Sequence, residues 1–523
     1  MCSFLNTMNK SLLERLLDFY HISYEDYLNL TKDVDLSNFA SGHAFNDIDN
    51  CVFLVKNAIA KKEKIIIYGD YDADGVMGTS ILVKMFQYLD YQVSYYIPSR
   101  YIDGYGLNMK HAKEYVEAGF NLVITVDNGI SAFEPIEYLK NNGVKVLVLD
   151  HHQVQEKVPN ADGICHPTYS KFGEVASSGA FTAFIFSISL LGYPDKYLST
   201  LAAISLISDM MPLLEYNRNL LRAVFKNYQK NEFLPLHLLS DGDKLDENVI
   251  GMKIAPRINS VGRLIEDTSI NDIVKFFTVD NPEWVLNYYS YIIGVNDSRK
   301  ELSKETSESL PIMDNPKAIV VSGDYLEGII GLVANQLMNK YHVPVVVFTN
   351  QGDEFKGSAR SPEGFDIVNA FNQLSDLLIT FGGHALAGGC SIKKENFNLF
   401  KERFIDLVSK TPLEYVSHPY IDIAFNELSV ENYELIKSFA PFGESFPAPQ
   451  FKLKRIKVDT LTYSRDQKHI LTSIGYSLRL VGFNFAKEEV NKYSYVNLVG
   501  SLRKSNYKNM TYLEFMIKEI EEA

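Results

Sequence analysis

Short apolar runs and helical patterns alternate through the first part of the chain. Four apolar runs predict buried strands, at Ile65–Tyr68, Tyr91–Arg100, Phe120–Gly129 and Val144–His152. Helices are predicted between them, over Gly78–Leu89, His111–Ala118 and Phe133–Asn141. Ser131 and Glu134 have the spacing of a capping box ahead of the last helix. Continuous apolar strands alternating with helices indicate an α/β fold with a parallel sheet covered on both faces.

Further patterns follow this domain. The region 220–313 is helical and charged, and a second α/β pattern of strand, loop, helix and strand begins at Lys317 and ends near Lys410. From about Pro419 short runs alternate, which predicts a small antiparallel β domain closed as a barrel. We therefore expect five parts along the chain. They are a helical segment (1–45), a parallel-sheet domain (46–219), a helical connector (220–313), a second α/β domain (314–410) and a β domain (419–523).

One uncharged stretch, Val175–Pro194, raises the question of a membrane span. Its apolar core of roughly 12 residues is too short to cross a bilayer, so a helix buried against the sheet is expected. The N-terminal residues carry charges at Lys10 and Glu14 and lack the uncharged centre of a signal peptide. The four cysteines form no C-x-x-C pair, which argues against a zinc knuckle or disulfide framework and fits a cytoplasmic location.

Net charge sets one constraint on the substrate. The chain has 523 residues, of which 22% are charged, and a formal net charge of −14. A protein this acidic is not expected to bind nucleic acid through its overall charge. A polyanionic substrate would have to be held by local basic groups or by metal ions.

Acidic and imidazole side chains follow the predicted strands, at the points where each strand ends. Three segments supply them, "GDYDADG", "VDNG" and "LDHH", and a fourth, "ISDMMPL", follows another apolar run. Because the carboxyl ends of parallel strands meet at one edge of a sheet, we expect these segments to share one site. The candidate residues are Asp70, Asp72, Asp74, Asp127, Asp150, His151, His152 and Asp209.

Simpler interpretations of these segments are less consistent with the pattern. "DYDADG" matches the start of an EF-hand, but Ile81 stands at the twelfth position, where that calcium loop needs a Glu. "DNG" is typical of a hairpin turn, but a predicted helix follows it rather than a partner strand. A solvated turn is the alternative for the first segment.

The ligand types predict a two-metal site. Carboxylates with one imidazole and no thiolate favour Mn²⁺ or Mg²⁺ over structural zinc. The negative charge exceeds what one divalent ion needs, so two ions bridged by a carboxylate are expected. Such a pair suits phosphoester hydrolysis, because it activates water and neutralises charge on the phosphate. The predicted ligands are Asp70, Asp72, Asp74, Asp127, His151 and Asp209.

The order and spacing of "GDYDADG", "VDNG", "DHH" and "ISDMMPL" resemble the DHH phosphoesterase superfamily. Within it the chain is similar to the RecJ family of bacterial single-strand-specific exonucleases, over nearly its whole length. The segments that carry this closer likeness are "IPSRYIDGYGL", "APRINSVGR", "KGSARSPEGFD", "FGGHALAGG" and "APFGESFPAPQF".

The resemblance implies a fold and an activity. The fold would be a DHH domain, a helical linker, a smaller DHH-associated α/β domain and a C-terminal OB-like β-barrel. The activity would be a metal-dependent 5′→3′ exonuclease on single-stranded DNA, acting in repair and recombination with Mn²⁺ or Mg²⁺. Single-strand-binding protein and a repair helicase would be partners, and no membrane is implied.

The resemblance also implies roles for individual residues. One metal would bind Asp74, Asp127, His151 and Asp209. The second would share Asp127 and add Asp72 and Asp70. The catalytic residues would be His152, which would contact the scissile phosphate, Asp127 and Asp150. Substrate contacts would come from Arg100, Arg257, Arg263, Ser358, Arg360, Gly382, Gly383 and His384. A surface ion pair is the alternative for each arginine, and a simple turn for the glycines.

Two positions depart from the family pattern. Leu326-Glu327 stands where members commonly carry His-Pro, and His166 stands where Asn is usual. Glu327 puts a negative charge near the expected substrate cleft, where it would weaken binding or alter end recognition.

The predicted β domain offers a basic, aromatic groove on which bases could stack, with a charged sheet edge as the alternative. Its candidate residues are Lys452, Lys454, Arg455, Lys457, Arg503, Lys504, Tyr507 and Lys508.

Two rival functions stay open at this point. A DHH-family phosphodiesterase acting on short oligoribonucleotides or cyclic dinucleotides would share the metal ligands, but such proteins usually end after the second domain. A non-catalytic DHH-derived scaffold would hold nucleic acid without cutting it, and such proteins tend to lose ligands.

Overall fold

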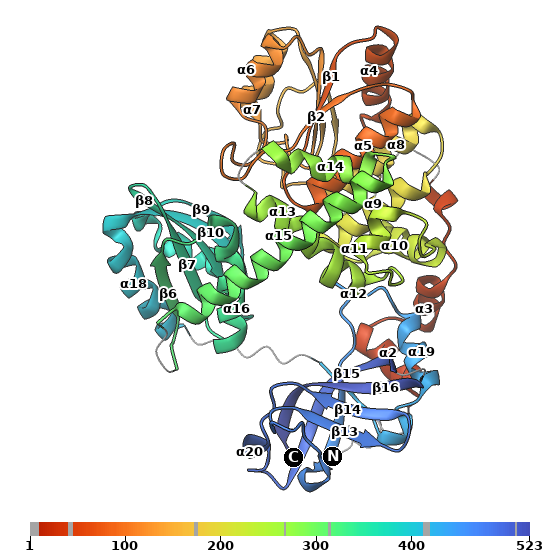
Figure 1. Cartoon of the computed structure of the whole chain (residues 1–523), viewed down its shortest axis with the longest axis vertical. Coiled ribbons are helices and arrows are strands. Elements are labelled where there is room, and N and C mark those ends of the chain that lie inside the picture. Colours follow the sequence, from red (N-terminus) through yellow and green to blue (C-terminus); the bar gives the residue numbers. More distant parts are fainter. Residues whose placement is uncertain are drawn as a thin grey trace. The chain divides into compact units, whose positions relative to one another are not determined.

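The first sheet holds five parallel strands in the order β2-β1-β3-β4-β5 (Figure 1). They are β1 (Ile65–Tyr68), β2 (Ser94–Tyr96), β3 (Leu122–Val126), β4 (Lys145–Leu149) and β5 (Gly163–Cys165). The computed structural model describes residues 10–39, 45–171, 176–265, 268–311, 315–411, 419–507 and 510–523. The predicted parallel sheet is confirmed, although β2 is shorter than predicted and β5, with 3 residues, is too short for an apolar pattern to reveal.

Helices cover both faces of this sheet. On one face α6 (Met109–Glu117) and α7 (Phe133–Asn141) bury Tyr115, Ile136 and Leu139 against the strands. The other helices of the domain pack on β1, β3, β4 and β5 and on one another. They are α4 (Ile48–Ala60), α5 (Ala73–Tyr88), α8 (Gly179–Leu191) and α9 (Lys196–Ser208).

The uncharged stretch forms the buried helix that was predicted. α8 is buried from Gly179 to Ile188, while Val175, the first residue of the stretch, lies outside the described residues. Within the described ranges, every helix is too short or too polar to span a bilayer.

The capping box predicted at Ser131 and Glu134 is wrong. α7 begins after Ala132, and no side chain caps its first turn. The Ser131 hydroxyl accepts a hydrogen bond from Gln155 Nε2 at 3.5 Å instead, because Ser131 lies one residue too early to reach the helix amides.

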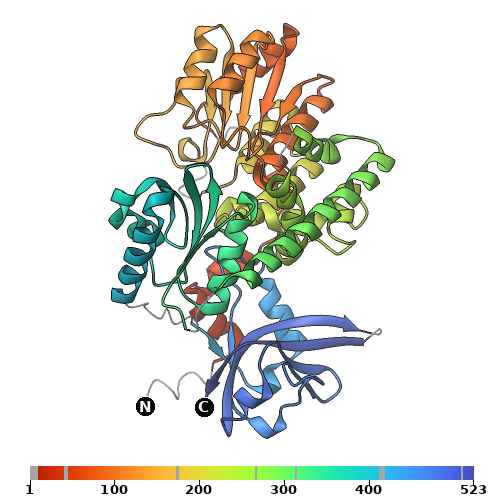
Figure 2. The same ribbon diagram turned by 60° about the vertical axis from the view of Figure 1, so that its left-hand side comes forward.

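The connector is helical, as predicted. A π-helical turn (Ile250–Ile254) joins α12 to α13 within it. α15 contacts α13 and α14 and also α16 of the next domain, and it is the long green helix in Figures 1 and 2, labelled in Figure 1. The helices are α10 (Glu215–Asn227), α11 (Leu234–Leu239), α12 (Glu247–Val249), α13 (Ala255–Leu264), α14 (Asp272–Thr278) and α15 (Pro282–Ser309).

The second sheet has five strands in the order β6-β7-β8-β10-β9, of which only β6 and β7 are parallel. α16 (Glu327–Tyr341) covers one face, while α17 (Ile367–Gln373) and α18 (Phe397–Lys410) bury the other. The predicted strand, helix and strand from Lys317 are confirmed. The strands are β6 (Ile319–Gly323), β7 (Val345–Gln351), β8 (Glu354–Arg360), β9 (Leu378–His384) and β10 (Ala387–Lys393).

The C-terminal sheet is mixed, so the prediction of a purely antiparallel domain is wrong. β13 and β14 form a hairpin, and β14 then pairs in parallel with β16, the last strand of the chain. β11 also pairs in parallel with β12. The order is β11-β12-β15-β16-β14-β13. The strands are β11 (Ile421–Asp422), β12 (Phe451–Lys457), β13 (Ile470–Ile474), β14 (Leu478–Gly482), β15 (Tyr495–Tyr507) and β16 (Met510–Glu522), with α19 (Val430–Ser438) and α20 (Lys487–Val490) beside them.

The chain divides into two compact units, and one of them is assembled from three segments, 1–35, 212–223 and 417–523. The other comprises 36–211 and 224–416. In the first unit, the N-terminal helices α2 (Leu12–Tyr20) and α3 (Tyr24–Thr31) join the C-terminal sheet. Tyr20 stacks on Phe446 with ring centroids 4.3 Å apart, and Arg218 donates to Pro441 O at 2.9 Å.

The close approach of α5 to the end of β1 gives a stability prediction. A Cβ on Gly75 would lie 2.5 Å from the Asp70 nitrogen, which is backbone and has little room to move. Gly75→Ala should therefore lower the unfolding free energy by about 1–3 kcal/mol. Gly294→Ala, in α15, meets open space and should raise it by up to about 1 kcal/mol, since Ala is the better helix former. Thermal unfolding of both variants checks this, and equal shifts would contradict it.

Candidate metal centre and phosphate-binding residues

The turn after β1 places the first acidic segment. Asp72 is the N-cap of α5 and accepts from the amides of Asp74 at 2.9 Å and Gly75 at 3.2 Å. Asp74 lies in the first helical turn, where its carboxylate accepts from the Gly179 and Ala180 amides of α8 at 2.7 and 2.8 Å. The N-terminus of α8 thus fixes the Asp74 carboxylate from the opposite side of the site.

His151 lies at the centre of the predicted ligand set. Its Nε2 is 3.0 Å from Asp127 Oδ1, 3.5 Å from Asp74 Oδ2 and 3.6 Å from Asp209 Oδ2. Asp127 directly follows β3 and His151 lies two residues after β4, as the sheet-edge prediction requires. Asp209 reaches the site from the C-terminus of α9, so its apolar run is a helix rather than a strand.

The structure brings all the predicted metal ligands together. Three groups of side chains each offer ligand atoms within 4.8 Å of one another: Asp70 with Asp72 and Asp127; Asp74 with His151 and Asp209; and Asp127 with His151 and His152. The first group has the three ligands predicted for one ion, and the second has three of the four predicted for the other, without Asp127. The third group includes His152, which the sequence analysis assigned to the scissile phosphate and not to a metal.

Burial and mutual repulsion dominate the electrostatics of this cluster. Burial, followed by the Asp72 charge, raises the pKa of Asp70 to about 8. Burial and the Asp74 charge raise the pKa of Asp209 to about 8 and also raise that of Asp127. Burial lowers the pKa of His151, which keeps the imidazole neutral and able to act as a ligand. Buried carboxylates with neutral imidazole are a donor set that fits divalent cations.

His152 differs from His151 because it has a dedicated partner. Its Nδ1 lies 2.8 Å from Asp150 Oδ1. Burial opposes the charged form, but the hydrogen bond and charge of Asp150 raise the pKa of His152 to about 9. The same pair lowers the pKa of Asp150 to about 2 against the effect of burial. Asp150 also accepts from the Ile130 amide at 2.8 Å, so it orients His152 from within the fold.

Tyr105 is a site residue that sequence reasoning missed. Its hydroxyl lies 2.9 Å from His152 Nε2 and 3.3 Å from Asp127 O, and the side chain is 54% exposed. Gly104 and Gly106 flank it with φ of 77° and 73°, a backbone that favours glycine. An aromatic residue between two glycines, within "IPSRYIDGYGL", was the available signal.

His166, the departure from Asn, supports the same loop. Its Nδ1 accepts from the Thr168 amide at 3.2 Å, so the proton is on Nε2, which donates to His152 O at 2.9 Å. Burial lowers its pKa, which favours this neutral form. The His166 imidazole therefore fixes the main chain of His152 through this hydrogen bond.

Four arginines gather where the first domain meets α15, α16 and β8. Burial, then the charges of Arg100 and Arg299, lower the pKa of Arg263 to about 10, and Arg360 adds to the effect. Arg100 stacks on the Tyr71 ring at 4.3 Å, Arg263 donates to Gly328 O at 3.1 Å, and Arg360 donates to Ser358 Oγ at 3.2 Å. Within the described part of the chain, none of the four forms an ion pair.

Arg299 was also missed, because one arginine in a long charged helix carries no sequence signal. Its Nε and that of Arg100 are buried without a hydrogen-bond partner among the described residues. Clustered cations without counter-ions are costly unless an anion binds between them.

Other predicted substrate contacts have different surroundings. Arg257 binds both oxygens of Asp241, at 2.9 and 3.0 Å, which is the ion pair given as its alternative. Gly382, Gly383 and His384 lie exposed at the end of β9, paired with β10. No described contact joins them to the metal ligands.

The negative charge of Glu327 is paired. Its carboxylate accepts from Lys356 Nζ at 2.6 Å and Gln351 Nε2 at 2.8 Å, and the side chain is 8% exposed. Lys356 precedes Ser358 and Arg360 on β8. The departure from His-Pro therefore adds an ion pair rather than a free charge.

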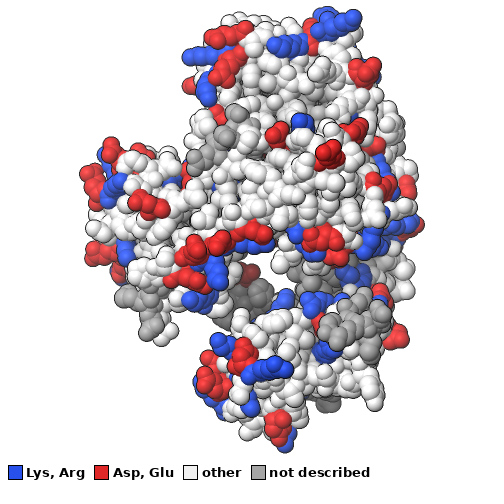
Figure 3. All heavy atoms as spheres, in the orientation of Figure 1, with Lys and Arg blue, Asp and Glu red and all other residues white. Residues whose placement is uncertain are grey.

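Most cations of the predicted C-terminal groove are paired too. Acidic partners hold them, and on the face in Figure 3 acidic and basic side chains are interspersed. The charged-edge alternative fits these residues better than a free basic groove. The Tyr507 side chain and Lys508 lie outside the described residues. The pairs are Lys452–Glu521, Lys454–Asp422, Lys457–Asp459, Arg503–Glu514 and Lys504–Glu434.

The raised carboxylate pKa values predict how stability depends on pH without metal. Asp70 and Asp209 hold protons in the folded protein up to about pH 8, whereas they lose them near pH 4 when unfolded. The metal-free protein should therefore lose stability as pH rises from about 4 to 8. Mn²⁺ should raise the melting temperature more at pH 8 than at pH 5.5, because deprotonated ligands bind it. Thermal melts with Mn²⁺ or EDTA measure this, and equal gains at both pH values would contradict it.

Three family models match successive parts of the chain. The DHH family N-terminal domain matches residues 64–211, the DHHA1 domain matches 315–410, and the RecJ OB domain matches 421–519.

Proteins named single-stranded-DNA-specific exonuclease RecJ are similar over most of the chain. The Salmonella typhimurium protein is 30% identical, over 84% of this chain and 83% of its own. The Haemophilus influenzae protein is 29% identical, over 88% of this chain and 86% of its own. The Bacillus subtilis protein is 30% identical over 94% of this chain, and the chain spans 65% of that relative's length.

Two solved structures share the fold. RecJ from Thermus thermophilus in complex with Mn²⁺ has a TM-score of 0.83 at 24% identity, over 98% of this chain and 78% of that one. An exonuclease RecJ bound to manganese has a TM-score of 0.62 at 29% identity, over 72% of this chain and 98% of that one. With the motifs, the metal centre and these matches, the chain belongs to the RecJ family of DHH phosphoesterases.

Proposed function

We propose that this chain is a metal-dependent exonuclease that degrades single-stranded DNA from the 5′ end. The observation that carries the proposal is that Asp127 shares a ligand group with Asp70 and Asp72 and also lies 3.0 Å from His151 of the second group, next to arginines without ion pairs among the described residues. The names of the relatives, single-stranded-DNA-specific exonuclease, support the substrate. Polarity rests on the family resemblance.

The ligand groups suggest how two divalent ions would be held. Asp74, His151 and Asp209 would bind one, Asp70 and Asp72 the other, and Asp127 would bridge them. Relatives solved with Mn²⁺ and Mg²⁺ support these ions. When bound, the pair would activate a water molecule and neutralise phosphate charge.

His152 is placed to act on the scissile phosphate. With a pKa of about 9 it is an imidazolium at neutral pH, so it can donate a proton or hydrogen bond to a phosphate oxygen. Asp150 fixes Nδ1, which leaves Nε2 beside the Tyr105 hydroxyl to face the substrate. Asp150 and Tyr105 are thus positioning residues for His152.

The arginine cluster would bind the DNA backbone. Arg100, Arg263, Arg299 and Arg360 lack acidic partners among the described residues, so phosphates can take that place without breaking an ion pair. Ser358, already bonded to Arg360, would add a hydroxyl donor. Local cations of this kind overcome the net charge of −14.

A nuclease of this type fits DNA repair and recombination in the bacterial cytoplasm, where single-stranded intermediates arise. Single-strand-binding protein and a repair helicase are the proposed partners, since both act on the same strands. The presence of a C-terminal OB domain favours the exonuclease over the rival phosphodiesterase of short oligoribonucleotides or cyclic dinucleotides, since such proteins usually end after the second domain. The intact ligand set argues against a non-catalytic scaffold.

The deciding assay uses single strands labelled at either end, as DNA and as RNA, with Mn²⁺ or a chelator. Mononucleotide release from 5′-labelled DNA at the earliest times, abolished by chelation, is the expected result. Early release of labelled mononucleotide from 3′-labelled DNA would contradict the proposed 5′→3′ polarity. Cleavage confined to short oligoribonucleotides would favour the rival phosphodiesterase.

Two variants separate metal binding from phosphate contact. Asp127→Asn should lower kcat by at least about 10³-fold, because both ions lose a ligand. His152→Gln should also lose activity but keep full Mn²⁺ stoichiometry in calorimetric titration. If His152→Gln binds one ion fewer than the unmodified protein, His152 is a metal ligand. If Asp127→Asn keeps near-normal turnover, Asp127 does not bridge the two ions.

The arginine cluster predicts a strong salt dependence of DNA binding. Removing one side chain that binds a phosphate of a single strand should make the slope of log affinity against log salt shallower by about 0.7. Arg299→Met and Arg360→Met should each show this change. Arg403→Met, which removes an exposed partner of Asp376, is the control and should not. Fluorescence anisotropy between about 50 and 200 mM salt measures the slopes. Equal slopes for the three variants would show that the arginine cluster does not bind phosphates of the strand.

A further inference from the structure

A buried asparagine directly follows the carboxylate proposed to bridge the two ions. Asn128 is 0% exposed, and its side-chain nitrogen donates to Val126 O at 2.9 Å and to Gly69 O at 3.0 Å. A third and longer hydrogen bond reaches Tyr68 O at 3.4 Å. Because all three neighbours are acceptors, only the nitrogen of the amide can face them, which fixes the orientation of the side chain.

These hydrogen bonds begin where the pairing of two strands ends. β1 and β3 are parallel neighbours, and the last residues paired between them are Tyr68 and Thr125. Gly69 and Val126 come directly after that pair, and the Asn128 amide joins their carbonyls. The side chain thereby continues the connection between the two strands past the end of the ladder.

The two carbonyls belong to peptide groups that lead into predicted metal ligands. The Gly69 carbonyl shares its peptide group with the Asp70 nitrogen. The Val126 carbonyl shares its own with the Asp127 nitrogen. Asp70 and Asp127, together with Asp72, offer ligand atoms within 4.8 Å of one another. One amide therefore joins the backbone beside two ligands of the same proposed ion, which come from different strands.

The backbone conformation of Asp127 gives this amide a second effect. The φ of Asp127 is 62°, in the left-handed region that residues with a Cβ seldom adopt. Such a conformation persists only where the surrounding structure holds it, and it is concentrated at functional sites. The hydrogen bond from Asn128 to Val126 O closes the turn around Asp127, from the residue after it to the residue before it.

The oxygen of the same amide has no such role. Asn128 Oδ1 is buried without a hydrogen-bond partner among the described residues, which destabilises the fold. An asparagine that served stability alone would have both ends of its amide bonded. Here the bonded end is the one that faces the turns bearing the ligands.

We propose that Asn128 is a positioning residue for the metal centre, which sets the separation of the Asp70 and Asp127 carboxylates. This inference rests on the two-ion centre of the proposed function. Without the amide, the end of β1 and the turn after β3 are no longer joined, and the ion held by Asp70, Asp72 and Asp127 binds less tightly. The other ion is affected less, because the α8 amides and the end of α9 place its carboxylates.

Calorimetric titration of Mn²⁺ into Asn128→Leu tests this, because leucine has the same branched shape and no donor. One of the two sites should lose affinity by about 10–100-fold, the usual effect of removing a partner behind a metal ligand. Electron paramagnetic resonance at two equivalents of Mn²⁺ adds a second readout. The unmodified protein should give the signal of a coupled pair, since ions about 3.5–4 Å apart interact, and the variant that of separate ions.

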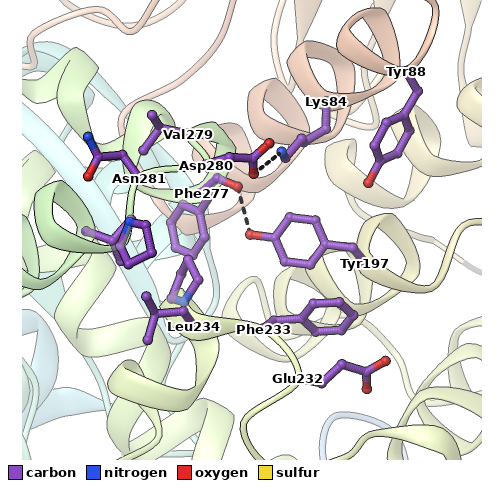
Figure 4. A pocket seen from close by; sticks show the side chains of 13 residues that line it. Lys84, Tyr88, Tyr197, Glu232, Phe233, Leu234, Phe277, Val279, Asp280 and Asn281 are labelled. Atoms are coloured by element: carbon purple, nitrogen blue, oxygen red, sulfur yellow. Dashed lines mark hydrogen bonds and ion pairs between the residues drawn. The ribbon is translucent and has the colours of Figure 1, made fainter.

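Tyr197→Phe is the matched control, because it also removes one buried donor while keeping the shape of the side chain. The Tyr197 hydroxyl donates to Phe277 O at 2.8 Å beside a separate cavity, and Figure 4 shows this hydrogen bond. The twelve residues from Tyr197 to Asp209 span roughly 18 Å of helix. Tyr197→Phe should lower the melting temperature but bind both ions as tightly as the unmodified protein.

A second variant keeps the test decisive if Asn128→Leu does not fold. Asn128→Ser keeps one donor on a shorter side chain and should weaken the same site. Unchanged Mn²⁺ affinity in the folded variant, or an equal loss in Tyr197→Phe, overturns the inference. Fewer than two ions on the unmodified protein would overturn the proposed two-ion centre as well. Two ions without exonuclease activity would overturn the proposed function alone.

Discussion

Repulsion among buried carboxylates is the constraint on which the rest of the molecule depends. The parallel sheet delivers Asp70, Asp72 and Asp127 to one edge, and α9 adds Asp209, and burial together with mutual repulsion raises the pKa of Asp70, Asp127 and Asp209. Asp74 is compensated by the protein, through the amides at the start of α8. The fold tolerates this because rigid elements fix each carboxylate: an N-cap, a strand end and a helix end. Divalent cations would remove the imbalance without any change in the scaffold.

A cluster of excess positive charge lies beside this excess of negative charge. The arginines around Arg263 carry no counter-ions among the described residues, and their elements come from both α/β domains and the connector. α15 is central to this arrangement, because it contacts α13 and α16 and carries Arg299. Under the proposed function, separate negative and positive clusters within one unit would let a protein with a net charge of −14 bind a polyanion. The net charge is a sum over the whole chain, whereas the charge at the site depends on which side chains the fold brings together there.

The sequence predicted the parts of this site that follow from local pattern. Asp70, Asp127 and His151 were predicted as site residues because they follow predicted strands, and short apolar runs locate strands directly. It could not predict Arg299 or Tyr105, since their roles depend on where a helix and a loop pack. It misplaced the cap of α7 by one residue. It predicted an antiparallel β domain where β14 and β16 pair in parallel, because strand order in a mixed sheet is decided by non-local contacts. Arg257 and the C-terminal lysines looked free in sequence, but most of their acidic partners lie far along the chain.

The assembly of one unit from three segments has a consequence for biosynthesis. α2 and α3 are made well before the residues they pack against, such as Phe439 and Phe446, which follow roughly 400 residues later. At typical translation rates of about 5–20 residues per second, Tyr20 and Tyr27 wait some tens of seconds without their aromatic partners. The larger unit can fold during that interval, because it contains its own sheets and cores. Closure of the smaller unit therefore waits for residues 417–523, and until they are made the apolar face of α2 lacks these partners.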